Sequence, residues 1–223
     1  MSAGRMAFPM GRRSPFFSVT AGVVVAFVAS ACGLTPAEEE LGGSDGDCPT
    51  VTRPEPVELE VNIIIERENY GSTHVLCAVE YVTSPPTSGP HFPAWQNCGF
   101  YTEPIRDETA VHALEHGAVW IAYEPDVDAL LIDEIAAIVE LDGHFIASPY
   151  PGLRNPIVVS AWDRQLALDR IGETVFADFT DRYLGRVSQT APEAGAPCDR
   201  AVGSPPDDPD DNYGEFLDSF KNR

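Results

Sequence analysis

The sequence predicts an α+β domain: a small mixed or antiparallel sheet with helices packed on one face, flanked by flexible tails. Short apolar runs typical of strands are interspersed with segments of helical periodicity. Two late runs, residues 144–148 and 157–161, are separated by a turn sequence containing proline and glycine, which indicates a hairpin. A hairpin that follows a helical crossover is typical of such a sheet. Both ends of the chain are rich in Gly, Pro and acidic residues, which do not form a core.

Two strands and a stiff loop are expected to open the domain. Residues 57–65 alternate and then become apolar, and residues 74–82 give the second strand. Residues 84–91 contain three prolines, each of which fixes its own φ and restrains the residue before it. This segment is therefore expected to be a rigid loop that ends at His91.

A short helix, a strand and a longer helix are expected next. Asp107 can cap a helix over residues 108–116, and Gly117 can end it. Residues 118–123 have the uninterrupted apolar character of a buried strand. Residues 127–141 then place apolar side chains at helical spacing.

The last predicted elements are strands over residues 144–148 and 157–161, joined by a turn at residues 150–154. A helix over residues 173–184 follows and presents Phe176, Phe179 and Tyr183 to the core. Residues 213–220 can dock as one more short element.

The N-terminus has the pattern of an export signal. Arginines precede the apolar run of residues 21–31, which is too short for a membrane span, and small residues then precede Cys32. This pattern favours a lipoprotein, in which Cys32 is lipidated and becomes the new N-terminus. The alternative is an ordinary cleavage site with an incidental cysteine. The chain is expected in the cell envelope, anchored by lipid on the extracytoplasmic side of a membrane.

Four parts are predicted along the chain: a signal peptide (1–31), a lipidated flexible stalk (32–55), a globular domain (56–200) and an acidic C-terminal tail (201–223). Within the tail, residues 204–211 are almost entirely proline and aspartate and are expected to be disordered.

The strong negative charge excludes nucleic-acid binding. The net charge of the whole chain is −21, and the leader contains three arginines and no acidic residue, so the mature chain carries −24. Such a surface repels phosphate backbones and attracts cations. The partners that remain are the membrane, through the lipid on Cys32, and an envelope protein.

Four cysteines follow the leader, which outside the cytoplasm predicts two disulfides. Three pairings can form from Cys48, Cys77, Cys98 and Cys198. Cys98–Cys198 with Cys48–Cys77 is favoured, because it ties the two N-terminal segments to each other. No Cys-x-x-Cys occurs, so a thioredoxin-type redox centre is not expected.

The densest group of chemically capable residues lies in Val-His-Ala-Leu-Glu-His-Gly, residues 111–117. His112 and His116 are four residues apart, which on a helix places both imidazoles on one face, as a metal pair requires. Glu115 points nearly the same way and can be a ligand, an orienting partner or a base. His91, at the end of the stiff loop, or His144 can supply a third imidazole. The alternative is that these histidines are structural core or capping groups.

The ligand chemistry narrows the choice of metal to zinc or copper(II). Imidazole and carboxylate suit both ions. The three methionines, Met1, Met6 and Met10, all lie in the leader, so a methionine-rich copper(I) site is excluded.

The same residues spell His-x-x-Glu-His, the zinc-peptidase pattern of inverted order. In such an enzyme both histidines bind zinc and Glu115 activates water. The pattern fits poorly here, because Gly117 ends the helix at once and no distant glutamate stands out as a further ligand.

Several motifs together resemble the bacterial domain-of-unknown-function family 3105. They are Tyr-Val-Thr-Ser-Pro-Pro-Thr-Ser-Gly-Pro-His at 81–91, Trp95, the histidine motif at 111–117 and Ser-Ala-Trp at 160–162. The likeness covers roughly residues 66–193. It implies an exported or membrane-anchored protein and places His91, His112, Glu115 and His116 in the family's motif set, without naming what they bind. The sequence departs from the pattern at Asp163, where glycine often follows Ala-Trp, and in its four cysteines.

Three hypotheses about function follow. The first is an exported lipoprotein with a histidine-lined site for zinc or copper(II), handling metal at the envelope. The second is a non-catalytic envelope interaction protein in which the motif is structural. The third is a metal-dependent hydrolase with Glu115 as base; on balance, the sequence leans away from an enzyme.

Overall fold

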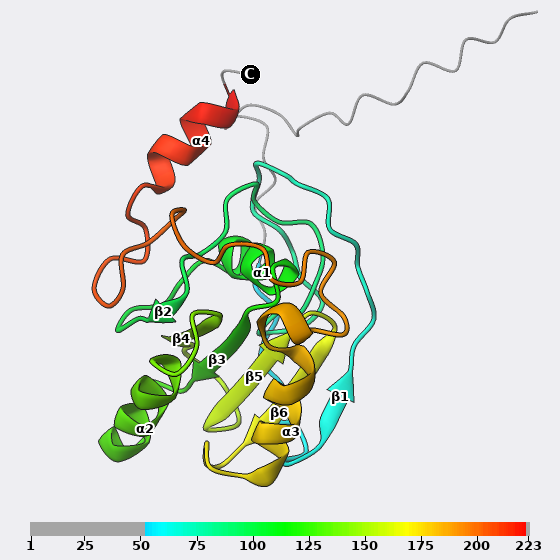
Figure 1. Cartoon of the computed structure of the whole chain (residues 1–223), viewed down its shortest axis with the longest axis vertical. Coiled ribbons are helices and arrows are strands. Elements are labelled where there is room, and N and C mark those ends of the chain that lie inside the picture. The colour runs from blue at the N-terminus through cyan, green and yellow to red at the C-terminus, as the bar shows by residue number, and fades with distance from the viewer. Residues whose placement is uncertain (1–51, 222–223) are drawn as a thin grey trace, which may run out of the picture. The chain divides into compact units, whose positions relative to one another are not determined.

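A six-stranded mixed sheet organises the part of the chain that the computed structural model describes, residues 52–221 (Figure 1). The strand order is β1-β6-β5-β3-β4-β2. The strands are β1 (Ile64–Glu66), β2 (Gly99–Phe100), β3 (Val119–Tyr123), β4 (Phe145–Pro149), β5 (Ile157–Ala161) and β6 (Arg164–Leu168). The predicted leader, the lipidation at Cys32 and the disulfide partner Cys48 lie outside the described residues.

Four α-helices and one 3-10 turn accompany these strands. They are α1 (Asp107–Glu115), α2 (Ala129–Val139), α3 (Thr174–Tyr183), η1 (Gly185–Val187) and α4 (Tyr213–Lys221). The predicted α+β class with a mixed sheet is confirmed. Among the described residues, no helix has the length and apolar character needed to cross a membrane.

The predicted hairpin of β4 with β5 is wrong, although both strands exist. β3 lies between them: it pairs with β4 in parallel, after the α2 crossover, and with β5 in antiparallel fashion. The hairpin joins β5 to β6, a strand that the sequence analysis missed, through a two-residue turn at Trp162 and Asp163. Asp163 has a φ of +59°, a conformation that aspartate tolerates and glycine prefers. The turn therefore still forms with Asp163 at the position where the family pattern often has glycine.

The two predicted opening strands are largely absent. Within residues 57–65 only the end forms a strand, because Asn62 adopts a φ of +63° and interrupts the extended chain, which before it makes only an isolated bridge from Val61 to Ala167. Residues 74–82 contain no strand; His74 forms one isolated parallel bridge, with His91. The segment pairs with the proline-rich loop instead of with the sheet.

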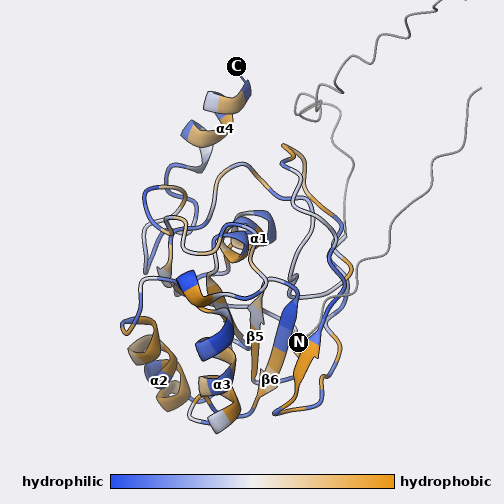
Figure 2. Cartoon of the chain, turned by 45° about the vertical axis from the view of Figure 1, so that its right-hand side comes forward, coloured by the Kyte–Doolittle hydropathy of each residue, from blue (hydrophilic) through white to orange (hydrophobic). Residues whose placement is uncertain are grey.

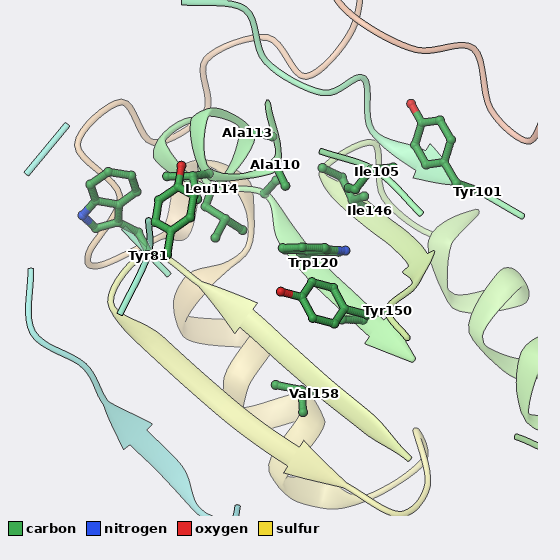
Figure 3. Close-up of a cluster of buried hydrophobic side chains, with 14 of the residues drawn as sticks. Tyr81, Tyr101, Ile105, Ala110, Ala113, Leu114, Trp120, Ile146, Tyr150 and Val158 are labelled. Atoms are coloured by element: carbon green, nitrogen blue, oxygen red, sulfur yellow. The ribbon is translucent and has the colours of Figure 1, made fainter. Parts of the chain in front are cut away.

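Both faces of the sheet are covered. On one face, α2 and α3 pack against alternate strand residues in an apolar cluster that includes Ile121, Ile135 and Phe179. Figure 2 shows α2 as largely hydrophobic around its surface. On the other face, α1 and the loops pack against Trp120, Tyr150 and Val158 (Figure 3). The prediction placed helices on one face; α1 and the loops add a layer on the second.

The C-terminal segment crosses back over α1 and belongs to the core. Val202 is fully buried and exchanges backbone hydrogen bonds with Trp95 and Asn97. The predicted disulfide Cys98–Cys198 is present, with Cα atoms 5.3 Å apart, and Cys77 is also disulfide-bonded. Residues 204–211, expected to be disordered, form hydrogen-bonded turns that begin at Ser204 and Asp208.

Candidate metal centre

The first two members of the candidate centre come from α1. His112 and Glu115 are three residues apart on this helix and share a face. Asp107, the predicted cap, lies inside the first turn: the N-cap is Arg106, without a side-chain hydrogen bond, and the Asp107 carboxylate pairs with Arg53 instead. His116 is the C-cap residue, and Gly117, with a φ of +92°, ends the helix as predicted.

The proline-rich loop brings two more histidines to this face of α1. His91 ends the loop, and its backbone N–H donates to Thr73 O while its carbonyl accepts from the N–H of Val75. These two bonds fix His74 beside His91, with ring centroids 5.1 Å apart. The contact joins segments that no sequence period relates, so the sequence alone does not predict that His74 belongs to the group.

Four residues thus form a group whose donor atoms all lie within 4.8 Å of one another: His74, His91, His112 and Glu115. The His112 ring centroid is 4.9 Å from that of His74 and 4.8 Å from that of His91. His91 is completely buried, and His112 and Glu115 are at most 5% exposed. His74 is the more accessible member.

Backbone carbonyls orient two of the imidazoles. The Nδ1 of His91 lies 2.8 Å from Gly89 O, and the Nδ1 of His112 lies 2.6 Å from Phe92 O. A carbonyl oxygen only accepts, so in both rings Nδ1 carries the proton and donates it. In a neutral ring the lone pair is then on Nε2, the arrangement found in metal-bound histidines.

The Nε2 of His91 has no hydrogen-bond partner among the described residues although it is fully buried. It lies 3.0 Å from Glu115 Oε2, but not in an orientation that makes a hydrogen bond. A neutral His91 therefore has a buried Nε2 lone pair without a donor, next to a carboxylate that does not lie along it. Two buried acceptors this close together are costly unless a cation, such as a metal ion, interacts with both.

The surroundings favour the forms that bind metal. Burial, with the adjacent His91 as a second cause, lowers the pKa of His112 to about 2, so its imidazole is neutral. Burial, the largest single cause, would raise the pKa of Glu115, but the neighbouring His91, Ser72 and His74 together outweigh it and the pKa is lowered. A neutral imidazole and an ionised carboxylate are the protonation states that ligands require.

The donor set fits a divalent transition metal after a small contraction. Ligand bonds of about 2.0–2.2 Å place tetrahedral donors about 3.4 Å apart. The contact of His91 with Glu115 is already that short, and the widest pair, within 4.8 Å, needs to close by up to about 1.4 Å. Three nitrogens and one carboxylate oxygen suit zinc or copper(II) and do not suit calcium or magnesium.

Two other histidines lie outside this group. The Nδ1–H of His116, which the sequence analysis placed in the centre, donates to Pro197 O at 2.6 Å, and its Nε2 lies 3.4 Å from Glu193. Its ring centroid is still 4.7 Å from that of His112, so it borders the centre. The weaker candidate His144 is held by Ala196 O and Asp142.

Comparison with known proteins gives one match. The sequence model of a family described as a protein of unknown function, DUF3105, matches residues 74–200, which is more than half of the chain. The matched segment begins at His74 and contains every residue of the candidate centre. Neither the curated proteins nor the solved structures gave a match.

Proposed function

The chain belongs to the DUF3105 family of proteins of unknown function, and from this premise we propose that it is a metal-binding protein of the cell envelope. The centre formed by His74, His91, His112 and Glu115 holds one divalent ion, zinc or copper(II). The leader and lipid anchor that the sequence predicts would hold the centre on the extracytoplasmic side of a membrane, where it handles metal.

One observation carries this proposal: the buried Nε2 of His91, which faces the Glu115 carboxylate without a hydrogen bond. Nδ1 of the same ring is already committed to Gly89 O. A bound metal would be coordinated by both this nitrogen and the carboxylate, and the imidazoles of His74 and His112 could be its two further ligands. The acidic chain supports the proposal, because it raises the local concentration of cations.

The geometry gives less support to the peptidase hypothesis. An enzyme of that type needs His112 and His116 on one ion, with Glu115 free to activate water. Here His112 is grouped with His74 and His91, and Glu115 is a member of the ligand group. Binding is therefore proposed in preference to hydrolysis.

The test is the metal content of the full chain, expressed with export so that disulfides form and purified without immobilised nickel. We expect about one equivalent of zinc or copper per chain by mass spectrometry of the metals. The His91→Ala, His112→Ala double variant should contain none.

His116→Ala is the matched control, because this imidazole borders the centre without joining it. It should keep at least most of the metal. If His116→Ala loses the metal while His74→Ala keeps it, the ligand set is the one that the sequence suggested. If the wild-type chain takes up no metal after dialysis against either ion, the cluster is structural and the proposal fails.

A further inference from the structure

The four members of the proposed centre differ in how deeply the fold holds them. Three of them are buried, and two of these three lie on α1. His74 is the most accessible member, and it lies outside the helices and strands on a segment, residues 71–75, that we call the His74 arm. Residues 71–73 of this arm are exposed. Exposed segments without regular structure open at a low free energy, so one side of the centre is able to move while the core stays folded.

Backbone hydrogen bonds hold the arm along the end of the proline-rich loop. The N–H of Gly89 donates to Gly71 O at 3.0 Å, the N–H of His91 donates to Thr73 O at 3.0 Å, and the N–H of Val75 donates to His91 O at 2.8 Å. The loop side of this contact is buried, with His91 completely so, whereas the arm side faces solvent. When these bonds break, the arm is therefore the partner that moves.

Two side chains of the arm act on the proposed centre. In an extended segment, residues two apart point to the same face, which places Ser72 on the side of His74. Hydrogen bonding from Ser72 is one of the causes that lower the pKa of Glu115. Opening of the arm would therefore remove one ligand and one partner of the carboxylate ligand together. The three buried ligands would stay in place, with one coordination position exposed.

The arm lies between two anchored points and begins at a glycine. Before it, Asn69 Nδ2 donates to Asp163 Oδ2 at 2.7 Å, and after it Cys77 is disulfide-bonded. Gly71 has a φ of +83°, which favours glycine, and an added β-carbon there would meet no atom within 4 Å. A substitution at Gly71 can therefore strain the closed arm without changing a ligand or a packing contact.

We infer that the His74 arm is the route by which the centre passes its ion to an acceptor protein; the inference rests on the proposed function, because it concerns the same centre. With the arm open, the bond between the ion and His74 is broken, and an imidazole or thiolate of the acceptor takes its position. The ion keeps its charge in this step, and the three buried ligands are replaced afterwards. The centre then transfers metal, instead of holding it permanently to stabilise the fold.

The experiment measures how fast the full chain releases its ion. The chain is loaded with zinc, or with copper(II) if the metal analysis finds that ion, and is mixed with the chelator 4-(2-pyridylazo)resorcinol, whose absorbance reports the released metal. At low chelator concentration the rate is proportional to the open fraction of the arm. Gly71→Ala strains the closed arm alone, so we expect release to be faster by about fivefold or more, at an unchanged stoichiometry.

Gly152→Ala is the matched control. Gly152 also has a positive φ, of +91°, and space for a β-carbon, but it lies in the loop between β4 and β5. This variant should release the ion at the wild-type rate. Ser72→Ala tests the arm a second time if Gly71→Ala does not fold: it removes a partner of Glu115 and should speed release about threefold.

The outcomes separate this inference from the proposed function. A chain that binds one ion, but releases it equally fast in Gly71→Ala and Gly152→Ala, overturns the exchange route alone. Faster release in His116→Ala with no change in Gly71→Ala or Ser72→Ala also overturns it, because the ion then leaves past His116. A wild-type chain that takes up neither zinc nor copper(II) overturns both proposals.

Discussion

The face of the sheet under α2 and α3 buries apolar side chains, whereas the face under α1 also buries polar groups that belong to the strands themselves. On the first face Ile121, Phe145 and Leu166 lie in one apolar cluster with Phe179 of α3. On the second face Trp120 Nε1 donates to Ser148 Oγ at 3.0 Å, and Gln165 Nε2 donates to Pro85 O at 2.8 Å.

The difference shows that one face mainly stabilises the fold and that the other also fixes the positions of particular side chains and loops. The apolar face needs only area and close packing to stabilise the domain. On the polar face each buried donor must meet a fixed acceptor, so position is specified more closely. Gln165 accepts from Arg67 and anchors Pro85, the start of the loop that ends in His91. The sheet thereby positions a proposed ligand through its own polar side chains.

The largest expected effect separates the two faces directly. Phe179→Ala removes a fully buried ring and should lower the free energy of unfolding by about 4 kcal/mol, while the folded protein keeps its metal stoichiometry. His112→Gln should do the reverse: metal binding weakens by at least 100-fold, and the metal-free stability changes by about 1 kcal/mol or less. Denaturant titration and metal analysis of both variants measure this. Equal destabilisation by the two variants would mean that His112 is a core residue.

A second prediction concerns the Asp107 carboxyl on the polar face. Burial raises its pKa from 3.8 to about 7. The folded chain then binds this proton more tightly than the unfolded chain does, so the stabilising contribution is present below about pH 4 and is lost as the pH rises through 7. The loss between pH 4 and pH 7 is about 3 kcal/mol.

Asp107→Asn has no such proton to lose. The difference in unfolding free energy between wild type and Asp107→Asn should therefore change by this amount across the same pH window, as measured by denaturant titration at each pH. A pH-independent difference would show that Arg53 keeps the carboxyl ionised throughout.

The third prediction tests whether polar strand residues position the ligands. Gln165→Leu leaves Pro85 O without its donor and should cost about 2 kcal/mol, and it should also weaken metal binding several-fold by releasing the loop before His91. Ser148→Ala should lower the free energy of unfolding by a comparable amount, because it leaves Trp120 Nε1 without its acceptor. It changes no contact of a loop that carries a proposed ligand. Weaker metal binding in Ser148→Ala than in Gln165→Leu would contradict this role of Gln165.

The smallest effect is expected at the β5–β6 turn. Asp163→Gly relieves a positive φ, a gain of about 1 kcal/mol, but loses the hydrogen bond from Asn69 Nδ2, at about the same cost. The net change should be near zero by thermal unfolding. Asp163→Ala loses the bond without relieving the backbone and should be the less stable of the two.

Local patterns in the sequence predicted the elements that depend on them. The apolar run of β5 gave its bounds correctly, and the helical spacing of α2 and α3 placed both helices within a few residues. Gly117 ended α1 because the position requires a left-handed residue; a β-carbon there would also lie 2.6 Å from Gly185 O. These features are set by neighbours along the chain.

What the sequence did not predict depends on contacts between distant segments. β6 begins with Arg164 and Gln165, polar residues whose sequence does not predict a strand. These residues form a strand because they pair with β5. His74 reaches the centre through a bridge to His91, and His116 lies outside the group because its Nδ1–H donates a hydrogen bond to Pro197 O, far along the chain. The sequence predicted three of the four grouped residues, His91, His112 and Glu115. It named His116 in place of His74 because the contacts that decide between these two histidines join distant segments of the chain.

All four grouped residues lie between His74 and Glu115, before the first central strand of the sheet. A chain that emerges from its N-terminus presents them together before β3 to β6, and before Cys198 can reach Cys98. An ion captured at that stage would close the long loop between the histidines early and lower the entropy of the unfinished chain. If the proposed centre binds its ion at that stage, it would also affect the order of folding, and the yield of correctly folded protein would depend on the metal present while the chain folds.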